Sequence, residues 1–331
     1  MLDEISSCYL DMAKAISQTQ DVIIACYNSD HRQHIRSLCQ KHGCDMRRIV
    51  LIVIESNDTW VRDFGPQLLL GNKEYQYLDL EFNAWGEQYA CRLDNLFAET
   101  LFNLAATPRC HYHRCPLVVE GGNLEFDSNA CLLTNIACIK RNMKNEQCDT
   151  DELIQRIKQE LSVKRVLTVD VPPLSGDDTG GHIDTLARFI DDETIVYASC
   201  HDSNHPDHAC LLQLQTQLRS LTTKQGTPYR LIPLPVPKKS ICLDEDHYAP
   251  ASYVNFVFIN GKVLVPIHDD EHDQRALEIF AENCPDREIV GINALPLLKQ
   301  FGSLHCATLH IPENVIDTRS LIDESSINTT R

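Results

Sequence analysis

The sequence predicts an α/β fold in which five similar units close into a ring. The first observation is a recurring order of a polar residue, a β-hairpin, a helix and a strand. The second is an incomplete unit at the C-terminus, whose missing helix and strand match the elements that begin the chain. A ring closed by the two termini accounts for both. The alternative is an ordinary α+β domain whose hairpins only look periodic.

The N-terminal elements and the first complete unit follow from hydrophobic spacing and turn signals. A helix, a strand, a helix and a strand are expected over residues 8–16, 22–25, 32–41 and 50–54. The first complete unit follows Asp63, and its hairpin turns at Gly71-Asn72-Lys73. Its hairpin strands, helix and closing strand are expected over residues 67–70, 75–80, 91–105 and 116–119.

The second and third units begin at Glu120 and His182. The second has a hairpin turn at Asp127-Ser128-Asn129, a helix capped by Asp149 or Thr150, and a closing strand. Its helix and closing strand are expected over residues 151–161 and 165–169. The third unit is expected to have strands, a helix and a closing strand over residues 185–190, 194–199, 209–221 and 229–234.

The fourth unit begins near Ser252, and its hairpin turns at Asn260-Gly261, the strongest short hairpin signal. Its helix and closing strand are expected over residues 274–281 and 288–290. The fifth unit begins at Cys306 with a strand over residues 307–311. The ring predicts a single domain over residues 1–331, of which residues 313–331 form a polar tail.

Composition narrows the function classes. The chain has 331 residues, 43% hydrophobic content and a net charge of −17. This is enough apolar material for one large domain or two ordinary ones. The acidic balance disfavours nucleic acid and membrane partners and favours small cations, although acidity can also serve solubility alone.

Cysteine usage and the N-terminus indicate a cytoplasmic protein with reduced thiols. The 15 cysteines are an odd number, and no CxxC pair occurs. The acidic opening is unlike a signal peptide, and no apolar run reaches membrane-spanning length. Most of the cysteines are expected to be small buried hydrophobic residues.

One loop has the residue types of a zinc site. Its candidate ligands are Cys200, His201, His205, His208 and Cys210. No second ligand pair follows at a suitable spacing, and polar residues and a proline surround them. A solvated surface loop is therefore the favoured interpretation, and no metal is expected.

Polar residues at the starts of the predicted β-runs supply a thiol, an imidazole and three carboxylates. They are Asp63, Glu120, His182, Asp184 and Cys306. These groups suit nucleophilic attack on a cationic carbon. Gly302, just before the cysteine, would let another group approach the backbone closely.

The same residues also have structural interpretations. Cys306 would fill the core, and Asp63 would form an ion pair with Arg62. His182 would hydrogen-bond a turn, and Glu120 would cap a loop. Their joint occurrence favours the functional interpretation.

The strand expected after Cys306 also places its neighbours. His305 should face away from Cys306 because successive strand residues point to opposite sides. Neither His305 nor His310 has an assigned role.

Six stretches, in order along the chain, resemble a known family. They are residues 57–66, 82–86, 120–123, 181–184, 251–256 and 302–306. The chain resembles the agmatine deiminases, within the group of Porphyromonas-type peptidylarginine deiminases. The resemblance spans about residues 50–311 and is highly specific because all six stretches are in register. It implies the pentein fold, or α/β-propeller, with five ββαβ modules around a pseudo-fivefold axis, in agreement with the ring.

The resemblance also implies a role for each polar anchor. Cys306 looks like the nucleophile, and His182 looks like the general acid and base. Asp63 and Asp184 look like the carboxylates that bind the guanidinium group and so take part in catalysis. Glu120 looks like the residue that orients His182.

Further residues resemble positions at the substrate pocket. Trp60 and Trp85 match positions that shape or border it, although tryptophans more often serve the core. Asn255 matches a position near the site, and all three residues are expected to bind substrate. Neither a cofactor nor a metal is implied.

The expected reaction is hydrolysis of agmatine to N-carbamoylputrescine and ammonia through a thiouronium on Cys306, a step of putrescine and polyamine synthesis. The expected partner is this small cationic guanidine, and a homo-oligomer is left open. One alternative is a deiminase or amidinotransferase for another guanidine, including peptidyl-arginine. Another is a cation-binding pentein without turnover.

The chain departs from the family at two places. It lacks an N-terminal segment with a Trp-Glu-Pro-His-like motif, so a first strand of the ring is expected to be missing beside Cys306. That would leave an exposed sheet edge. Gly180 stands where relatives usually carry Asp or Asn, so the loop is expected to be looser or to bind the substrate tail differently.

Overall fold

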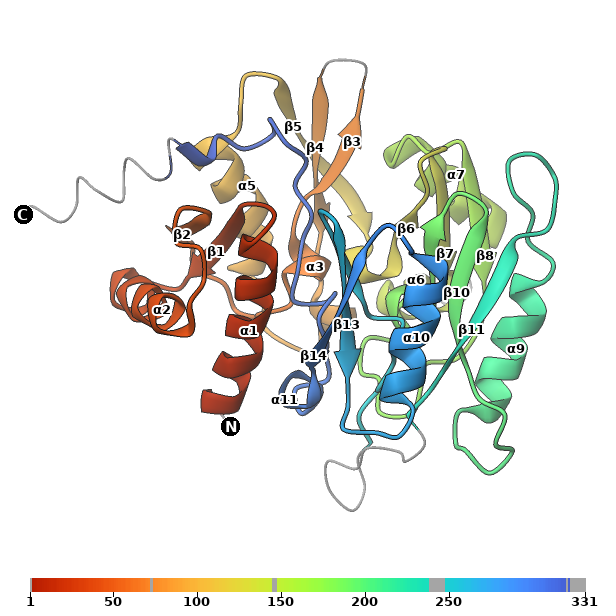
Figure 1. The fold of residues 1–331 in the computed structure, drawn as a ribbon. Coiled ribbons are helices and arrows are strands. Elements are labelled where there is room, and N and C mark those ends of the chain that lie inside the picture. The colour runs from red at the N-terminus through yellow and green to blue at the C-terminus, as the bar shows by residue number, and fades with distance from the viewer. Residues whose placement is uncertain (1, 72–73, 145–147, 238–247, 320, 322–331) are drawn as a thin grey trace, which may run out of the picture.

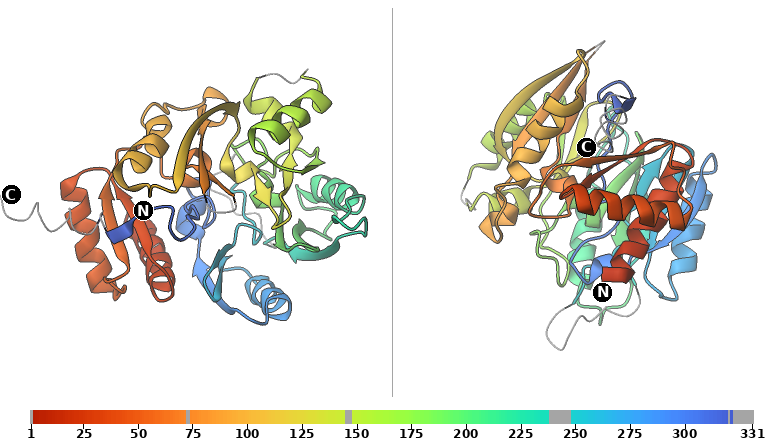
Figure 2. Two further views of the ribbon diagram at one scale, coloured as in Figure 1. Left: turned by 90° about the horizontal axis from the view of Figure 1, so that it is seen from above. Right: turned by 90° about the vertical axis from the view of Figure 1, so that its left-hand side faces the viewer.

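A computed structural model describes residues 2–71, 74–144, 148–237, 248–319 and 321. Over these residues the chain forms five small sheets (Figure 1). Seen from above, the sheets follow one another round the molecule in chain order (Figure 2). The predicted ring of five units is therefore confirmed. The turn residues 72 and 73, and residues 320 and 322–331 of the predicted tail, lie outside the described residues.

Four of the sheets share one pattern. In the first, β3 (Gln67–Leu70) pairs antiparallel with β4 (Tyr75–Glu81), and β5 (Cys110–Val118) pairs parallel with β4. The helix α5 (Asp94–Ala105) connects β4 to β5. A hairpin can join antiparallel strands, whereas a parallel pair needs a crossover, which the helix supplies.

The same order recurs three times, and a helix of 11 residues lies in each crossover. The second sheet has β6 (Glu125–Phe126), β7 (Cys131–Asn135) and β8 (Arg165–Val169), with α7 (Thr150–Glu160). The third has β9 (Ala187–Asp191), β10 (Thr194–Ser199) and β11 (Arg230–Pro235), with α9 (His208–Leu218). The fourth has β12 (Val257–Ile259), β13 (Lys262–Ile267) and β14 (Glu288–Asn293), with α10 (Asp273–Asn283).

The fifth sheet is formed by the N-terminal part of the chain. Its two described strands, β1 (Val22–Cys26) and β2 (Ile49–Val53), pair in parallel across α2 (Ser29–His42). The first helix, α1 (Leu2–Ser17), packs against α2 and also against β14 of the fourth sheet. This helix therefore joins the first and last parts of the chain and closes the ring.

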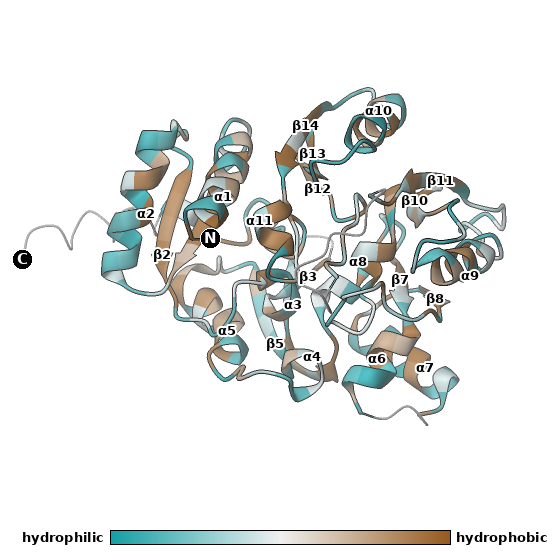
Figure 3. Ribbon diagram, turned by 90° about the horizontal axis from the view of Figure 1, so that it is seen from below, coloured by the Kyte–Doolittle hydropathy of each residue, from teal (hydrophilic) through white to brown (hydrophobic). Residues whose placement is uncertain are grey.

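The core lies between each sheet and its outer helix. In the second unit, Leu153 and Ile157 of α7 are buried together with Leu132 of β7. Each such side chain contributes about 1.5–3 kcal/mol through its burial. Figure 3 shows how apolar and polar residues are distributed between the core and the outside. The strand β2 is mostly hydrophobic, whereas the outer helix α2 is mostly hydrophilic. Among the described helices, none is both long and apolar enough to cross a bilayer.

Most predicted elements are confirmed within a few residues, but the predicted strand over residues 307–311 is wrong. The chain turns there instead, because the N–H groups of Ala307 and Thr308 donate to Ser303 and His305 carbonyl oxygens, at 3.3 and 3.0 Å. The Cys306 carbonyl oxygen accepts from the Arg62 N–H at 3.1 Å, not from a strand partner. The strand argument that placed His305 opposite Cys306 therefore does not hold.

Several short helices were also not predicted. The first turn of the strand expected over residues 185–190 is helical, so that α8 (Ile183–Leu186) precedes β9. The others are α3 (Val61–Phe64), α4 (Ala84–Glu87), η1 (Gly121–Asn123), α6 (Ile136–Asn142) and α11 (Leu295–Leu298). Among them, η1 contacts both α3 and α8, and these three elements carry or follow the polar anchors.

The contribution of the N-cap of α7 to stability can be tested by mutation. The Asp149 side chain accepts from the Glu152 N–H at 2.9 Å, as the sequence predicted. Asp149→Ala should lower the free energy of unfolding by about 1 kcal/mol in urea titrations because this N–H loses its partner. Asp151→Ala, which removes a charge from the same turn but no cap, should cost only about 0.3 kcal/mol. Equal losses in the two variants would contradict the capping role.

Candidate active site

A cavity of about 320 Å³ brings together segments that are far apart in sequence. Its inner wall includes Cys306, Asp63, Trp60 and Trp85. Its remaining lining residues are Asp58, Tyr89, Asp178, Thr179, Lys299, Gln300, Phe301 and Gly302. The volume suits one small molecule. The predicted nucleophile and one predicted carboxylate therefore face the same cavity.

Cys306 is held by Asn255. The Asn255 Oδ1 accepts from the N–H groups of His305 and Cys306, at 2.8 and 3.3 Å. Its Nδ2 lies 3.4 Å from the Cys306 sulfur. Asn255 does not line the cavity but fixes the cysteine from behind, so it is a positioning residue. The prediction that it binds substrate directly stays untested.

Gly302 allows the Trp60 ring to lie against the backbone just before the cysteine. A Cβ at this position would lie 2.3 Å from the ring, which no side chain can accommodate. The close approach predicted for this glycine is therefore present. Trp60 is only 8% exposed and forms part of both the core and the cavity wall.

Asp184 lies between Cys306 and His305. Its Oδ2 is 2.7 Å from the His305 Nδ1 and 3.9 Å from the Cys306 sulfur. Burial, together with the cations of Arg188 and Arg62, holds the pKa of His305 well below its ordinary value, so a neutral imidazole shares a hydrogen bond with Asp184. His305 therefore points toward the site, contrary to the prediction.

The second oxygen of Asp184 is buried without a hydrogen-bond partner among the described residues. Asp184 is 1% exposed, and its Oδ1 has no hydrogen-bond partner within the described part of the chain. Burial raises the pKa of this carboxyl to about 7. A cation placed against Oδ1 would restore the carboxylate to its charged form.

Asp63 and Glu120 lie on the two sides of the His182 ring. The His182 Nδ1 is 3.6 Å from Asp63 Oδ1, and its Nε2 is 3.8 Å from Glu120 Oε2. Burial alone would lower the pKa of His182, but the Asp63 charge, Cys138 and Glu120 act in the opposite direction. The pKa therefore lies well above its ordinary value. His182 is a cationic acid at neutral pH.

Asp63 is held by two donors that fix its orientation. The Gly122 N–H donates to Oδ1 at 2.9 Å, and the Trp85 indole N–H donates to Oδ2 at 3.0 Å. A Cβ on Gly122 would lie 2.6 Å from His182 Nδ1, so only glycine fits between these groups. Trp85 lies in a left-handed turn with φ 54°, a strained conformation that aims its indole at Asp63.

Burial keeps the Cys306 thiol protonated in the free protein. Burial, then the charges of Asp184 and Asp63, raise the pKa of Cys306 well above its ordinary value. The thiol would thus be unreactive until a positive charge enters the cavity. Such a cation offsets both carboxylates and favours the thiolate.

Sequence reasoning missed the residues that tie the loops together. Buried Arg62 does not pair with Asp63 as the structural alternative required. Its guanidinium instead contacts the His305 carbonyl oxygen at 3.4 Å and the His310 Nδ1 at 3.3 Å. The Asn123 Oδ1 accepts from the Ile183 N–H at 3.1 Å, next to His182. Arg62 and Asn123 both lie in stretches that resemble the family. This resemblance was the sequence signal that could have identified them.

Gly180 adopts φ 92°, a conformation that favours glycine. Its neighbour Gly181 has φ 98°, and the Gly181 carbonyl oxygen accepts from the Asn135 Nδ2 at 2.8 Å. The loop before His182 is thus tied to the second sheet. Whether it changes binding of the substrate tail stays a prediction.

One group of metal-ligand side chains occurs among the described residues, at a place the sequence did not indicate. Glu120, Cys138 and His182 bring one ligand atom each within 4.8 Å of one another. The loop over residues 200–210, which is fully described, forms no such group. The His208 Nδ1 there contacts the Cys200 carbonyl oxygen at 3.1 Å. All fourteen described cysteines are free thiols.

The comparison with known proteins identifies the family. Residues 1–312 match the Porphyromonas-type peptidyl-arginine deiminases. The chain belongs to this family. The predicted enzyme class, a hydrolase acting on C–N bonds of linear amidines, is confirmed by this membership.

Solved structures of relatives have the same fold. A Porphyromonas gingivalis protein provisionally named an arginine deiminase is 37% identical, with a TM-score of 0.88 over 96% of this chain and 92% of that one. A C. jejuni agmatine deiminase with substrate bound is 29% identical, with a TM-score of 0.82 over 92% and 86%. A Legionella pneumophila (strain Paris) protein provisionally named an agmatine deiminase is 29% identical over 95% of this chain and 88% of its own length. The predicted pentein fold is confirmed.

The contact between Asn255 and the cysteine can be tested by thiol reactivity. Asn255→Asp keeps the acceptor for both N–H groups but replaces the Nδ2 beside the sulfur with a second oxygen. It should raise the pKa of Cys306 further and slow its alkylation by iodoacetamide at pH 8 by about tenfold. Mass spectrometry of the Cys306 peptide measures this rate.

Asn255→Ala serves as the matched variant, since it removes the donor without adding a charge. Its alkylation should therefore be slowed less than that of Asn255→Asp. The Asn255→Asp protein should be shown to be folded by circular dichroism. If its rate of Cys306 alkylation at pH 8 is unchanged, the positioning role is disproved.

Proposed function

We propose that the protein hydrolyses agmatine to N-carbamoylputrescine and ammonia through a covalent intermediate on Cys306. The single observation that carries this proposal is a buried thiol in the cavity wall, with Asp63 in the same wall and the Asp184 Oδ2 3.9 Å from the sulfur. Family membership and the agmatine deiminases among the relatives support it.

Asp184 and Asp63 would bind the guanidinium group. A guanidinium stays protonated at any cellular pH and offers N–H donors in one plane. The unpartnered Asp184 Oδ1 would accept from one edge. Asp63, held by Gly122 and Trp85, would accept from another edge with its remaining lone pairs. Two charge-assisted contacts would then fix the plane, so that the sulfur meets the carbon from one face.

The substrate would activate its own nucleophile. Its positive charge offsets Asp63 and Asp184, the charges that keep the Cys306 thiol protonated. The thiol proton passes to solvent, because His182 is already protonated, and the thiolate then attacks the guanidinium carbon and forms a tetrahedral adduct. His182, which is cationic before this step, gives its proton to the departing nitrogen, and ammonia leaves.

The same imidazole would complete the reaction. Once it has lost a proton, His182 can accept one from water, which attacks the thiouronium carbon. The carbon–sulfur bond breaks, the ureido product leaves, and the Cys306 sulfur takes back a proton. Glu120 would hold the ring in place through its contact with Nε2, at 3.8 Å.

The outer part of the cavity suits the second positive charge of agmatine. Asp58 and Asp178 line it, and burial raises the pKa of Asp178 to about 6. An ammonium group beside Asp178 would favour its charged form. The lysine of this wall, Lys299, lies 3.3 Å from Glu4, so its charge is partly offset. A substrate ending in an amine therefore fits better than one ending in a carboxylate.

A second candidate is deimination of arginine or peptidyl-arginine. The family description and the arginine deiminase name of the Porphyromonas gingivalis relative favour it. A substrate carboxylate would then have to meet Lys299 in place of Glu4. Amidino transfer to an amine and cation binding without turnover are the remaining alternatives. The cytoplasmic location, the link to putrescine synthesis and a homo-oligomer stay predictions.

The reaction is tested by measuring ureido product from agmatine, arginine and an arginyl peptide. The full chain should form product from agmatine with a kcat/KM at least tenfold above that for arginine, since arginine adds a carboxylate near Asp178. Cys306→Ala should abolish turnover. Cys91→Ala, which removes a partly buried thiol that does not line the cavity, should retain it. Product from arginyl peptide alone would favour the second candidate. Binding of a guanidine without product would favour a cation-binding protein without turnover.

The role of Asp178 is tested with a pair of substrates. Asp178→Asn should raise KM for agmatine by about tenfold or more, because a charge-assisted contact to the second amine is lost. KM for butylguanidine, which has the same guanidinium but no second charge, should change little. Equal changes for both substrates would contradict this role.

A further inference from the structure

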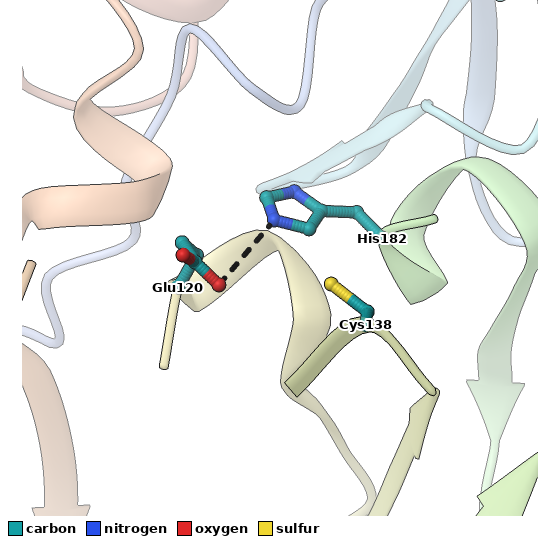
Figure 4. Close-up of side chains that lie close together, drawn as sticks. All are labelled: Glu120, Cys138 and His182. Atoms are coloured by element: carbon teal, nitrogen blue, oxygen red, sulfur yellow. Dashed lines mark ion pairs between the residues drawn. The ribbon is translucent and has the colours of Figure 1, made fainter. Parts of the chain in front are cut away.

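We propose that Glu120, Cys138 and His182 form a binding site for a thiophilic divalent cation such as Zn²⁺, behind the wall of the substrate cavity. The site uses a cysteine that plays no part in the proposed reaction. Figure 4 shows the three side chains turned toward one another from three separate segments. A carboxylate oxygen, a sulfur and a ring nitrogen lie within 4.8 Å of one another.

The donor set and its spacing suit zinc. Zinc takes Cys, His and carboxylate ligands at about 2.0–2.3 Å, which places neighbouring ligand atoms about 3.3–3.8 Å apart. The Glu120 Oε2 and His182 Nε2 are already 3.8 Å apart. A small inward movement of the side chains would complete three corners of a tetrahedron. The fourth corner would be left to water.

Two of the three ligand atoms lack a hydrogen-bond partner among the described residues. Glu120, Cys138 and His182 are each no more than 1% exposed. Within the described residues, neither Glu120 Oε2 nor His182 Nε2 has a hydrogen-bond partner. Unpartnered buried polar atoms cost free energy, and a bound cation would satisfy both at once.

An outer residue fixes two of the ligands, as is usual at metal sites. The Asn142 Nδ2 donates to Glu120 Oε1 at 3.1 Å and lies 3.6 Å from the Cys138 sulfur. Both contacts leave other lone pairs of these ligands available. Asn142 thus holds the carboxylate and the thiol in place whether or not a metal is bound.

The cation would reach the site past Thr179. This residue lines the substrate cavity, and its carbonyl oxygen lies 3.6 Å from the Cys138 sulfur on the other side. The metal would replace the thiol proton of Cys138 and any proton on His182 Nε2, and these protons would pass to solvent. The resulting charges of a carboxylate and a thiolate would balance the two positive charges of the metal.

Metal binding would block the proposed reaction, a consequence that rests on the proposed function. With Nε2 bound to zinc, His182 would keep only its Nδ1 proton. It could then not form the imidazolium that protonates the leaving nitrogen, and its ring would have no lone pair left to accept a proton from water. Cys306 and Asp184 would remain free. Zinc would therefore inhibit turnover without occupying the guanidinium position.

The site is tested by titrating the full chain with Co²⁺, which reports thiolate ligation through a charge-transfer band in the near ultraviolet. The wild type and Cys306→Ala should both show the band. Cys138→Ser should lose it, and Glu120→Gln should bind Co²⁺ at least about tenfold more weakly. Cys200→Ala, in the loop with the other zinc-type residues, is the control and should keep it.

Each other outcome overturns the proposal. No band in the folded wild type would exclude the site, and a band that survives Cys138→Ser would place the metal elsewhere. A band lost only in Cys306→Ala would put it on the nucleophile. In turnover assays, Zn²⁺ should inhibit the wild type at concentrations about tenfold below those needed for Cys138→Ser. If the wild type turns over no guanidine, the proposed function fails, while the cobalt spectra still decide the metal site.

Discussion

The burial of three carboxylates at one place is the constraint on which the rest of the structure depends. Asp63, Asp184 and Glu120 are at most 4% exposed, beside a buried thiol. Isolated buried charges are costly, so each must find donors or a counter-charge. His182 supplies one charge, and Gly122, Trp85 and other donors supply hydrogen bonds. Within the described residues, Asp184 Oδ1 and Glu120 Oε2 have no hydrogen-bond partner, which favours a cation at this site.

The ring makes this concentration of charge compatible with a stable fold. Apolar clusters shared by neighbouring units fill the space between the sheets and their helices, and these clusters do not require the acidic residues. The connections before the hairpins are then free to carry polar groups. Buried asparagines tie these connections across units: Asn123 holds the segment of His182, and Asn255 holds that of Cys306. A neutral amide satisfies backbone groups without adding another charge.

This division also explains what the sequence could predict. Hairpins and crossover helices depend on local signals, so turns such as Asn260-Gly261 and the cap at Asp149 were predicted correctly. The segment around Cys306 was not, because contacts with Asn255 and Arg62, each far away in sequence, make it a turn. That turn brings His305 to Asp184, which no periodicity could reveal. Cys138 was indistinguishable from the other buried cysteines until its neighbours were known.

The same electrostatics would govern binding, activation and release in the proposed reaction. A guanidinium that enters the cavity offsets Asp63 and Asp184, and this charge balance is what permits Cys306 to ionise. A neutral molecule of the same shape would fill the space but leave the thiol protonated. The ureido product is such a molecule at its reacting end, since hydrolysis removes the positive charge there. Its contacts with both carboxylates weaken as the thiol regains its proton, so turnover itself would weaken the hold on the product.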